Sequence, residues 1–239
     1  MCGRYAIKTS APELAAMFEI SATPNDLEGT VSYNVAPTQS VPVCARDGSR
    51  RRLETMRWGL IPSWAKDARS SARMINARAE TVASSGAFRA SFRSRRAIVP
   101  SDGFYEWRRS GSVKQPFFLH PPEGAVLAMA GLWAIWKDPD TGLWVPSAAV
   151  ITTAANRLVS SIHDRMPVLL PRETWDDWLD PEMDDTDYLQ SLLQPAPDDV
   201  LAMYPISTAV NNVRNKGPEL LDPIEEVEAP TLRLEVPDG

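Results

Sequence analysis

The chain has 239 residues, of which 44% are hydrophobic and 23% charged, which indicates a globular protein with one sizeable core and excludes a disordered or fibrous chain. No apolar run approaches the roughly 18 to 20 residues of a membrane span, and the first residues lack an apolar signal-peptide stretch. We therefore expect a cytoplasmic protein without a membrane partner. The few cysteines and histidines, Cys2, Cys44, His120 and His163, form neither a disulfide framework nor a Cys/His zinc site at any usual spacing.

The net charge of −6 hides a division along the chain. Residues 1–114 carry 18 Lys and Arg against 10 Asp and Glu, whereas residues 115–239 carry 7 against 21. A basic segment attracts phosphates even within an acidic protein, because salt screens charges beyond about 8 Å. Charge alone leaves two interpretations open, a nucleic-acid contact or a solvated mixed surface.

Hydrophobic patterning predicts many short strands and few helices. Residues 11–20 are expected to form a short amphipathic helix, and two more helices are expected at Pro171–Leu179 and Asp187–Leu193. Apolar or β-branched runs bounded by Pro, Gly, Asp or Ser predict strands at Val41–Cys44, Ala97–Val99, Pro116–Leu119, Ala125–Trp136, Ala148–Thr153 and Pro167–Leu170.

The order of these elements predicts the fold class. There is neither an internal repeat nor a regular alternation of strands and helices, and the 21 prolines indicate long loops. We expect one α+β domain over residues 1–224, built on a mixed or mostly antiparallel sheet with flanking helices, followed by an acidic tail over residues 225–239. A monomer is the default expectation.

The first candidate catalytic residue is Cys2, which directly follows the initiator methionine. Removal of Met1 leaves a cysteine with both a free α-amine and a thiol. The ordinary pKa of the α-amine is about 7.7 to 8.0 and that of the thiol about 8.5, so a fraction of each is nucleophilic at neutral pH. Two chemistries stay open: imine and thiazolidine formation with an aldehyde, or acyl transfer with the amine as base. An incidental residue at a frayed end is the alternative.

Three further polar residues stand within apolar or small-residue stretches. Glu106 lies between aromatic residues, which would raise its pKa and suit it to acid/base chemistry, although a surface position on an edge strand is the alternative. His163 precedes an apolar strand and has the pKa range of a proton shuttle. Asn76 is an amide that can orient a nucleophile, or simply form a turn. Structural roles are the simpler interpretation of each residue alone.

Arginines alternate with aromatic residues and prolines along the basic segment and beyond it. Guanidinium groups bind phosphate oxygens and aromatic rings stack on unpaired bases, so this mixture is typical of a single-strand groove. No glycine-rich phosphate loop of either common kind is present, which disfavours nucleotide cofactors. The set is Arg4, Arg57, Trp58, Trp64, Arg78, Arg95, Arg96, Trp107, Arg108, Arg109 and Arg165.

The chain resembles the SOS-response-associated peptidase (SRAP) family, the HMCES-like abasic-site-processing proteins. The resemblance spans nearly the whole chain to about Pro223, with its motifs in order. They are Met1–Arg4, Tyr33–Pro37, Trp58–Pro62, Ile75–Thr81, Gly103–Trp107, Lys114–Phe118, Ile162–Pro167 and Val210–Asn215. The resemblance implies a single SRAP-type domain with a barrel-like sheet and no cofactor or metal.

The resemblance also implies a function in the DNA-damage response. It implies binding to single-stranded DNA that contains an abasic site, and a covalent thiazolidine crosslink between Cys2 and the sugar aldehyde. Asn76 would position the α-amine, Glu106 would assist ring opening and imine formation or reversal, and His163 would transfer protons at the sugar oxygen. It further implies lyase-type activity, a thiol autopeptidase (hydrolase) activity that removes Met1, and association with the nucleoid during DNA damage.

For the DNA contacts, the resemblance implies two groups of residues. Arg4, Arg78 and Arg165 would bind phosphates, with a hydroxyl contact from Thr152. Pro37 and Trp64 resemble a wedge at a strand junction. Some relatives have a second tryptophan after the position of Trp64, whereas this chain has Ala65, so a weaker junction preference is expected.

Two rival functions remain open. An N-terminal-cysteine hydrolase of the glutamine amidotransferase type also begins Met-Cys-Gly and uses its own α-amine as base. It accounts for only the first three residues. A non-covalent single-stranded DNA-binding module with an inert Cys2 is the third hypothesis.

Overall fold

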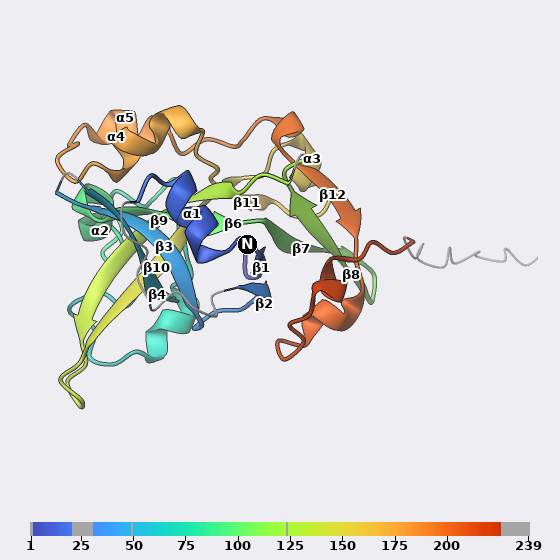
Figure 1. Cartoon of the computed structure of the whole chain (residues 1–239), viewed down its shortest axis with the longest axis horizontal. Helices are drawn as coiled ribbons and strands as arrows, with labels where there is room; N and C mark the ends of the chain where they lie inside the picture. Colours follow the sequence, from blue (N-terminus) through green and yellow to red (C-terminus); the bar gives the residue numbers. More distant parts are fainter. Residues whose placement is uncertain (1, 21–30, 49, 123, 226–239) are drawn as a thin grey trace, which may run out of the picture.

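A computed structural model describes residues 2–20, 31–48, 50–122 and 124–225. Two β-sheets dominate these residues, and short helices lie around them (Figure 1). The predicted α+β class is confirmed. Within the described residues, no helix has both the length and the apolar composition needed to cross a membrane. The predicted acidic tail lies outside the described residues from position 226 on.

The larger sheet closes into a barrel. Its path β10-β4-β3-β6-β9 returns to β10 because β9 also pairs with β10. Only the β4–β10 pair of this ring is parallel, so the predicted mostly antiparallel, barrel-like sheet is confirmed. Two short strands, β5 and β11, also pair with β10. The bounds are β3 (Ser40–Asp47), β4 (Arg50–Trp58), β5 (Asn76–Arg78), β6 (Arg96–Ser101), β9 (Leu127–Lys137), β10 (Trp144–Ala154) and β11 (Arg165–Pro167).

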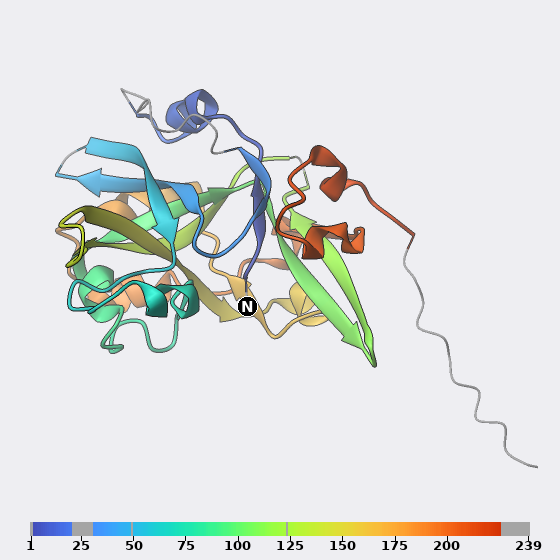
Figure 2. The same ribbon diagram turned by 90° about the horizontal axis from the view of Figure 1, so that it is seen from below.

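The smaller sheet holds the beginning of the chain. Its order is β12-β8-β7-β1-β2, and all its pairs are antiparallel. Figure 2 shows the β7–β8 hairpin projecting away from the barrel, with β1 between this hairpin and the barrel. The bounds are β1 (Tyr5–Ile7), β2 (Ser32–Val35), β7 (Gly103–Ser110), β8 (Val113–His120) and β12 (Ala202–Pro205).

Gly103 permits the close approach of β7 to its neighbours. It pairs with Ala6 of β1, and a Cβ atom at this position would lie 2.3 Å from Cζ of Phe118 and 2.6 Å from the carbonyl oxygen of Leu119. Any side chain here would therefore push β8 away from β7. This glycine fixes the start of the strand that carries Glu106.

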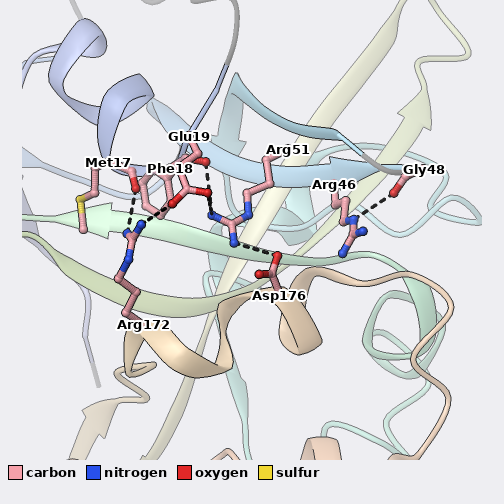
Figure 3. Close-up of polar contacts among 8 residues, drawn as sticks. All are labelled: Met17, Phe18, Glu19, Arg46, Gly48, Arg51, Arg172 and Asp176. Carbon is pink, nitrogen blue, oxygen red and sulfur yellow. Dashed lines mark hydrogen bonds and ion pairs between the residues drawn. The ribbon is translucent and has the colours of Figure 1, made fainter.

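The helices are short, and side-chain contacts attach the end of α1 to the rest of the fold. The predicted first helix is confirmed as α1, and it ends because Glu19 adopts a left-handed conformation with φ 58°. Figure 3 shows how α1 is held: Arg172 donates to the carbonyl oxygen of Met17, and Arg51 lies between Glu19 and Asp176. The helices are α1 (Ala11–Met17), α2 (Arg89–Ser94), α3 (Arg157–Ser160), α4 (Trp175–Leu179) and α5 (Thr186–Ser191).

Two predicted elements need correction. The strand expected at Pro167–Leu170 lies earlier, as β11 over Arg165–Pro167, and only an isolated bridge from Leu169 to Met129 follows. The helix expected at Pro171–Leu179 is a 3₁₀ turn over Arg172–Thr174 followed by α4. The other 3₁₀ turns are η2 (Arg69–Arg73), η4 (Asp198–Val200), η5 (Thr208–Asn211) and η6 (Pro218–Leu221).

A buried arginine joins the helices to the barrel. Arg96 is 2% exposed, and its guanidinium donates to carbonyl oxygens at the ends of two helices. Because helix ends leave carbonyl groups without partners, this side chain satisfies both ends at once. The acceptors are Phe92 (2.8 Å), Arg93 (2.6 Å), Trp178 (2.7 Å), Met183 (3.1 Å) and Asp180.

We expect Arg96→Ala to lower the free energy of unfolding by about 3 kcal/mol, because it leaves several buried carbonyl groups without donors. Urea denaturation followed by circular dichroism measures the change. Arg93→Ala is the matched control, since the Arg93 side chain is exposed on α2, whose last carbonyl groups Arg96 binds, and it should change stability by less than about 0.5 kcal/mol. Equal effects of the two substitutions would contradict this role of Arg96.

Candidate active site around Cys2

Cys2 lies at the entrance of β1 and is buried. Its exposed fraction is 0%, and it belongs to the main apolar core. Asn76, the first residue of β5, donates from Nδ2 to the carbonyl oxygen of Cys2 over 2.8 Å. Among the described residues, the Oδ1 atom of Asn76 is buried without a hydrogen-bond partner. The amide is thus fixed on one side and presents a hydrogen-bond acceptor on the other.

Glu106 lies in β7, pairs with Phe117 of β8, and is only 3% exposed. Burial raises the pKa of its carboxyl to about 7. Burial also raises the pKa of the Cys2 thiol, and the charge of Glu106 is the second cause. The carboxyl group is therefore within electrostatic range of Cys2, with a pKa suited to giving and taking protons near neutral pH.

His163 lies in the loop before β11. Burial lowers the pKa of its imidazole, and Asp164 opposes this shift. Nδ1 accepts a hydrogen bond from the backbone N–H of Arg165 over 3.0 Å and lies 2.9 Å from Oδ1 of Asp164. Burial is the largest cause of the raised pKa of Glu106, and the negative charge of Asp164 is a smaller cause in the same direction. The loop that holds His163 therefore lies near the Glu106 carboxyl.

Three strands bring three of the candidate DNA contacts together, namely Arg78, Thr152 and Arg165. Thr152 of β10 pairs with Arg78 of β5, and Ala154 pairs with Arg165 of β11. Arg78 is exposed, whereas the Thr152 side chain is buried and its hydroxyl donates to the carbonyl oxygen of Ala77. The carbonyl oxygen of Thr152 accepts from Nη2 of Arg165 over 2.6 Å. Thr152 thus contacts Arg165 directly.

Arg4 occupies a half-buried position beside β2. Its guanidinium donates to the carbonyl oxygens of Val210 (2.9 Å) and Asn211 (3.1 Å) and to Oδ1 of Asn34. Asn34 is fully buried and donates from Nδ2 to three carbonyl oxygens, including that of Asn215 over 3.0 Å. These contacts give the Val210–Asn215 motif a structural role: it anchors the C-terminal segment to the beginning of the chain.

Pro37 and Trp64 lie on separate loops. Pro37 is half-buried and precedes Thr38, whose φ of 73° is rare for a β-branched residue. Trp64 is 67% exposed, with its loop held by a hydrogen bond from Nε1 of Trp136 to the carbonyl oxygen of Ala65. An exposed indole on an anchored loop is available for stacking.

The sequence interpretation missed Glu80, which binds Arg165 through both carboxylate oxygens. The sequence signal that could have indicated this ion pair is an acidic residue two positions after Arg78. In the part of the chain that the structure describes, no group of three or more His, Cys, Asp or Glu residues is placed to hold a metal ion.

This arrangement, with a buried Cys2 at the entrance of β1 beside a barrel, can be compared with known families. The chain matches the model of the SOS response associated peptidase (SRAP) family over residues 1–213 and belongs to this family. The resemblance seen in the sequence is confirmed.

Two relatives and one solved structure illustrate the similarity. The Bacillus subtilis abasic site processing protein YoqW is 42% identical over 223 residues, which cover 93% of this chain and 99% of YoqW. The Gallus gallus abasic site processing protein HMCES is 35% identical over 225 residues, which cover 81% of this chain and 66% of HMCES. A crystal structure of a Bacteroides thetaiotaomicron protein matches with a TM-score of 0.85 at 27% identity, covering 93% of this chain and all of that one.

Proposed function

We propose that this protein binds single-stranded DNA and forms a covalent crosslink between Cys2 and the aldehyde of an abasic site, which shields the damaged strand. One observation carries the proposal: Cys2 is buried between two polar groups, since Asn76 donates to its carbonyl oxygen over 2.8 Å and the buried Glu106 carboxyl, with a pKa of about 7, lies within electrostatic range of its thiol. The names of YoqW and HMCES as abasic site processing proteins support the choice of substrate.

The crosslink proceeds in two steps. The α-amine of Cys2 adds to the aldehyde carbon of the ring-opened sugar, and loss of one water gives an imine. The thiol then adds across the carbon–nitrogen double bond: sulfur bonds to carbon, and the thiol proton moves to nitrogen. A five-membered thiazolidine results. Removal of Met1, by the chain itself or by an aminopeptidase, must come first because it releases the amine; Met1 lies outside the described residues.

The polar residues around Cys2 supply the proton transfers. Oδ1 of Asn76 accepts a hydrogen bond from the α-amine and orients it toward the sugar. Glu106 exchanges protons during ring opening, imine formation and reversal, which would also permit lyase-type turnover. His163, whose pKa is lowered by burial, transfers protons at the sugar oxygen.

The DNA contacts follow from charge and exposure. Arg78 and Arg165 bind phosphates near the end of β10, and Thr152 orients Arg165 through its carbonyl oxygen. Arg4 keeps its protein contacts and adds its charge to the phosphate site. Pro37 and Trp64 form the wedge against the bases, with Trp64 stacking.

Denaturing gel electrophoresis with intact mass analysis tests the proposal. Single-stranded DNA with one abasic site should give a heat-stable adduct, whose mass is that of the chain without Met1 plus the DNA minus one water. Intact DNA of the same sequence should give none. A chain that begins at Cys2 and forms no adduct would contradict the proposal and favour glutamine hydrolysis or passive binding.

We expect Arg78→Ala to weaken binding to single-stranded DNA about threefold to tenfold and to lower the slope of log affinity against log salt by about 0.7, because one phosphate contact is lost. Fluorescence anisotropy across a salt series measures both. Arg89→Ala is the control, since Arg89 is exposed on α2. Identical slopes for wild type and Arg78→Ala would remove Arg78 from the DNA contacts.

A further inference from the structure

The carboxylate of Glu80 forms an ion pair with the guanidinium group of Arg165. Oε2 of Glu80 lies 2.9 Å from Nη2 of Arg165, and Oε1 contacts Nη1. The Glu80 side chain is 52% exposed, whereas that of Arg165 is 17% exposed. Parallel contacts of this kind are the geometry with which arginine also binds phosphate. The carboxylate therefore fills the edge of Arg165 that a DNA phosphate would use.

Hydrogen bonds to β10 of the barrel position both Glu80 and Arg165. The carbonyl oxygen of Thr152 accepts both from the backbone N–H of Ala79 (2.8 Å) and from Nη2 of Arg165 (2.6 Å). Nε2 of Gln190 donates to the carbonyl oxygen of Ala79 over 2.6 Å. Glu80 follows Ala79 directly, so its backbone is fixed next to β10. The ion pair is thus built into the end of three paired strands.

The charges of the site keep Glu80 ionised. The hydrogen bond from Arg165 is the largest cause of its lowered pKa, and the charges of Arg165 and Arg78 lower the pKa further. Glu80 therefore lies within the field of both arginines. At neutral pH its negative charge offsets one of the two positive charges at this end of β10.

We propose that Glu80 limits the affinity of this protein for undamaged DNA by competing with backbone phosphate for Arg165. This inference rests on the DNA-binding function proposed above and names a specificity determinant of that site. A phosphate must share or displace the carboxylate before it engages Arg165, which weakens non-covalent binding to any sequence. The covalent bond at Cys2 needs no such contact, so retention on DNA depends on the abasic aldehyde rather than on phosphate binding.

Glu80→Gln tests the inference with undamaged single-stranded oligonucleotide as the probe. The substitution removes the charge at nearly constant volume. We expect the dissociation constant to fall about fivefold at about 50 mM salt, and the salt slope to steepen by up to about 0.7, because phosphate no longer shares Arg165 with a carboxylate. The matched control is Glu54→Gln, which removes the same charge from another ion pair, Arg52–Glu54 at 2.9 Å. It should bind as the wild type does.

A double variant tests whether the gain in DNA affinity depends on Arg165. In an Arg165→Met protein, Glu80→Gln should add nothing, because the group for which the carboxylate competes is absent. Unchanged or weaker binding by Glu80→Gln alone would overturn the inference, as would an equal gain in Glu54→Gln or in the Arg165→Met background. If neither the wild type nor Glu80→Gln bound undamaged DNA at low salt, while both still formed the covalent adduct, the proposed crosslinking would stand and this inference would fall.

Discussion

Cys2→Ala is expected to abolish the heat-stable adduct with abasic DNA, because the thiol that would close the proposed thiazolidine ring is gone. The α-amine survives the substitution once Met1 is removed, so the imine should still form. Borohydride, which reduces an imine to a stable amine, should therefore trap the variant on the DNA. Denaturing gels with and without borohydride distinguish the two products. We expect at least about a hundredfold loss of adduct without the reductant.

Cys44→Ala is the matched control for this experiment. Cys44 is the other buried cysteine, and it lies in β3 of the barrel. Its substitution removes the same atoms from the core while leaving Cys2 intact, so crosslinking should be retained. A heat-stable adduct of unchanged yield in Cys2→Ala would refute the thiazolidine.

Glu106→Gln is expected to slow crosslink formation about 10²-fold or more, since a positioned acid/base group contributes about 10²- to 10⁴-fold in enzymes. In the wild type, the rate should change with pH around an inflection near 7, where burial places the pKa of this carboxyl. This inflection should be absent in the variant, which should keep only the pH dependence of the Cys2 α-amine, whose ordinary pKa is about 7.7 to 8.0. Quenched time courses on abasic DNA from about pH 5 to 9 measure both effects.

Stability measurements separate this chemical effect from a folding defect. Because the folded-state pKa of Glu106 is raised, the protonated form is favoured on folding, and its contribution to stability is lost as the pH rises from about 4.5 to about 7. Glu106→Gln removes this loss, so above about pH 7 the variant should be at least as stable as the wild type. Glu54→Gln is the control for both assays. A wild-type crosslinking rate in Glu106→Gln would exclude this carboxyl from the mechanism.

Much of the fold follows from local patterns. The apolar runs between prolines and glycines predicted β3, β6, β8, β9 and β10, because a strand needs only a short apolar or β-branched segment with breakers at its ends. The strands β1, β2 and β12 have three or four residues each, which is too short for a recognisable alternation. The predicted strand Pro167–Leu170 overlaps β11 only at Pro167, although Val168 and Leu170 still donate backbone hydrogen bonds to Ile151 and Ala128 of the barrel.

For the candidate site, the sequence by itself determined the chemical groups: a cysteine able to carry a free amine, a glutamate between aromatic residues, and arginines near tryptophans. Only the tertiary structure decided their surroundings. Asn76 reaches Cys2 across 74 positions, and Glu80 reaches Arg165 across 85. Such contacts depend on which strands pair with β10, and strand order is set by packing of the whole core, which no local pattern encodes. The burial that raises the pKa of Glu106, and the carboxylate that occupies Arg165, are both consequences of that packing.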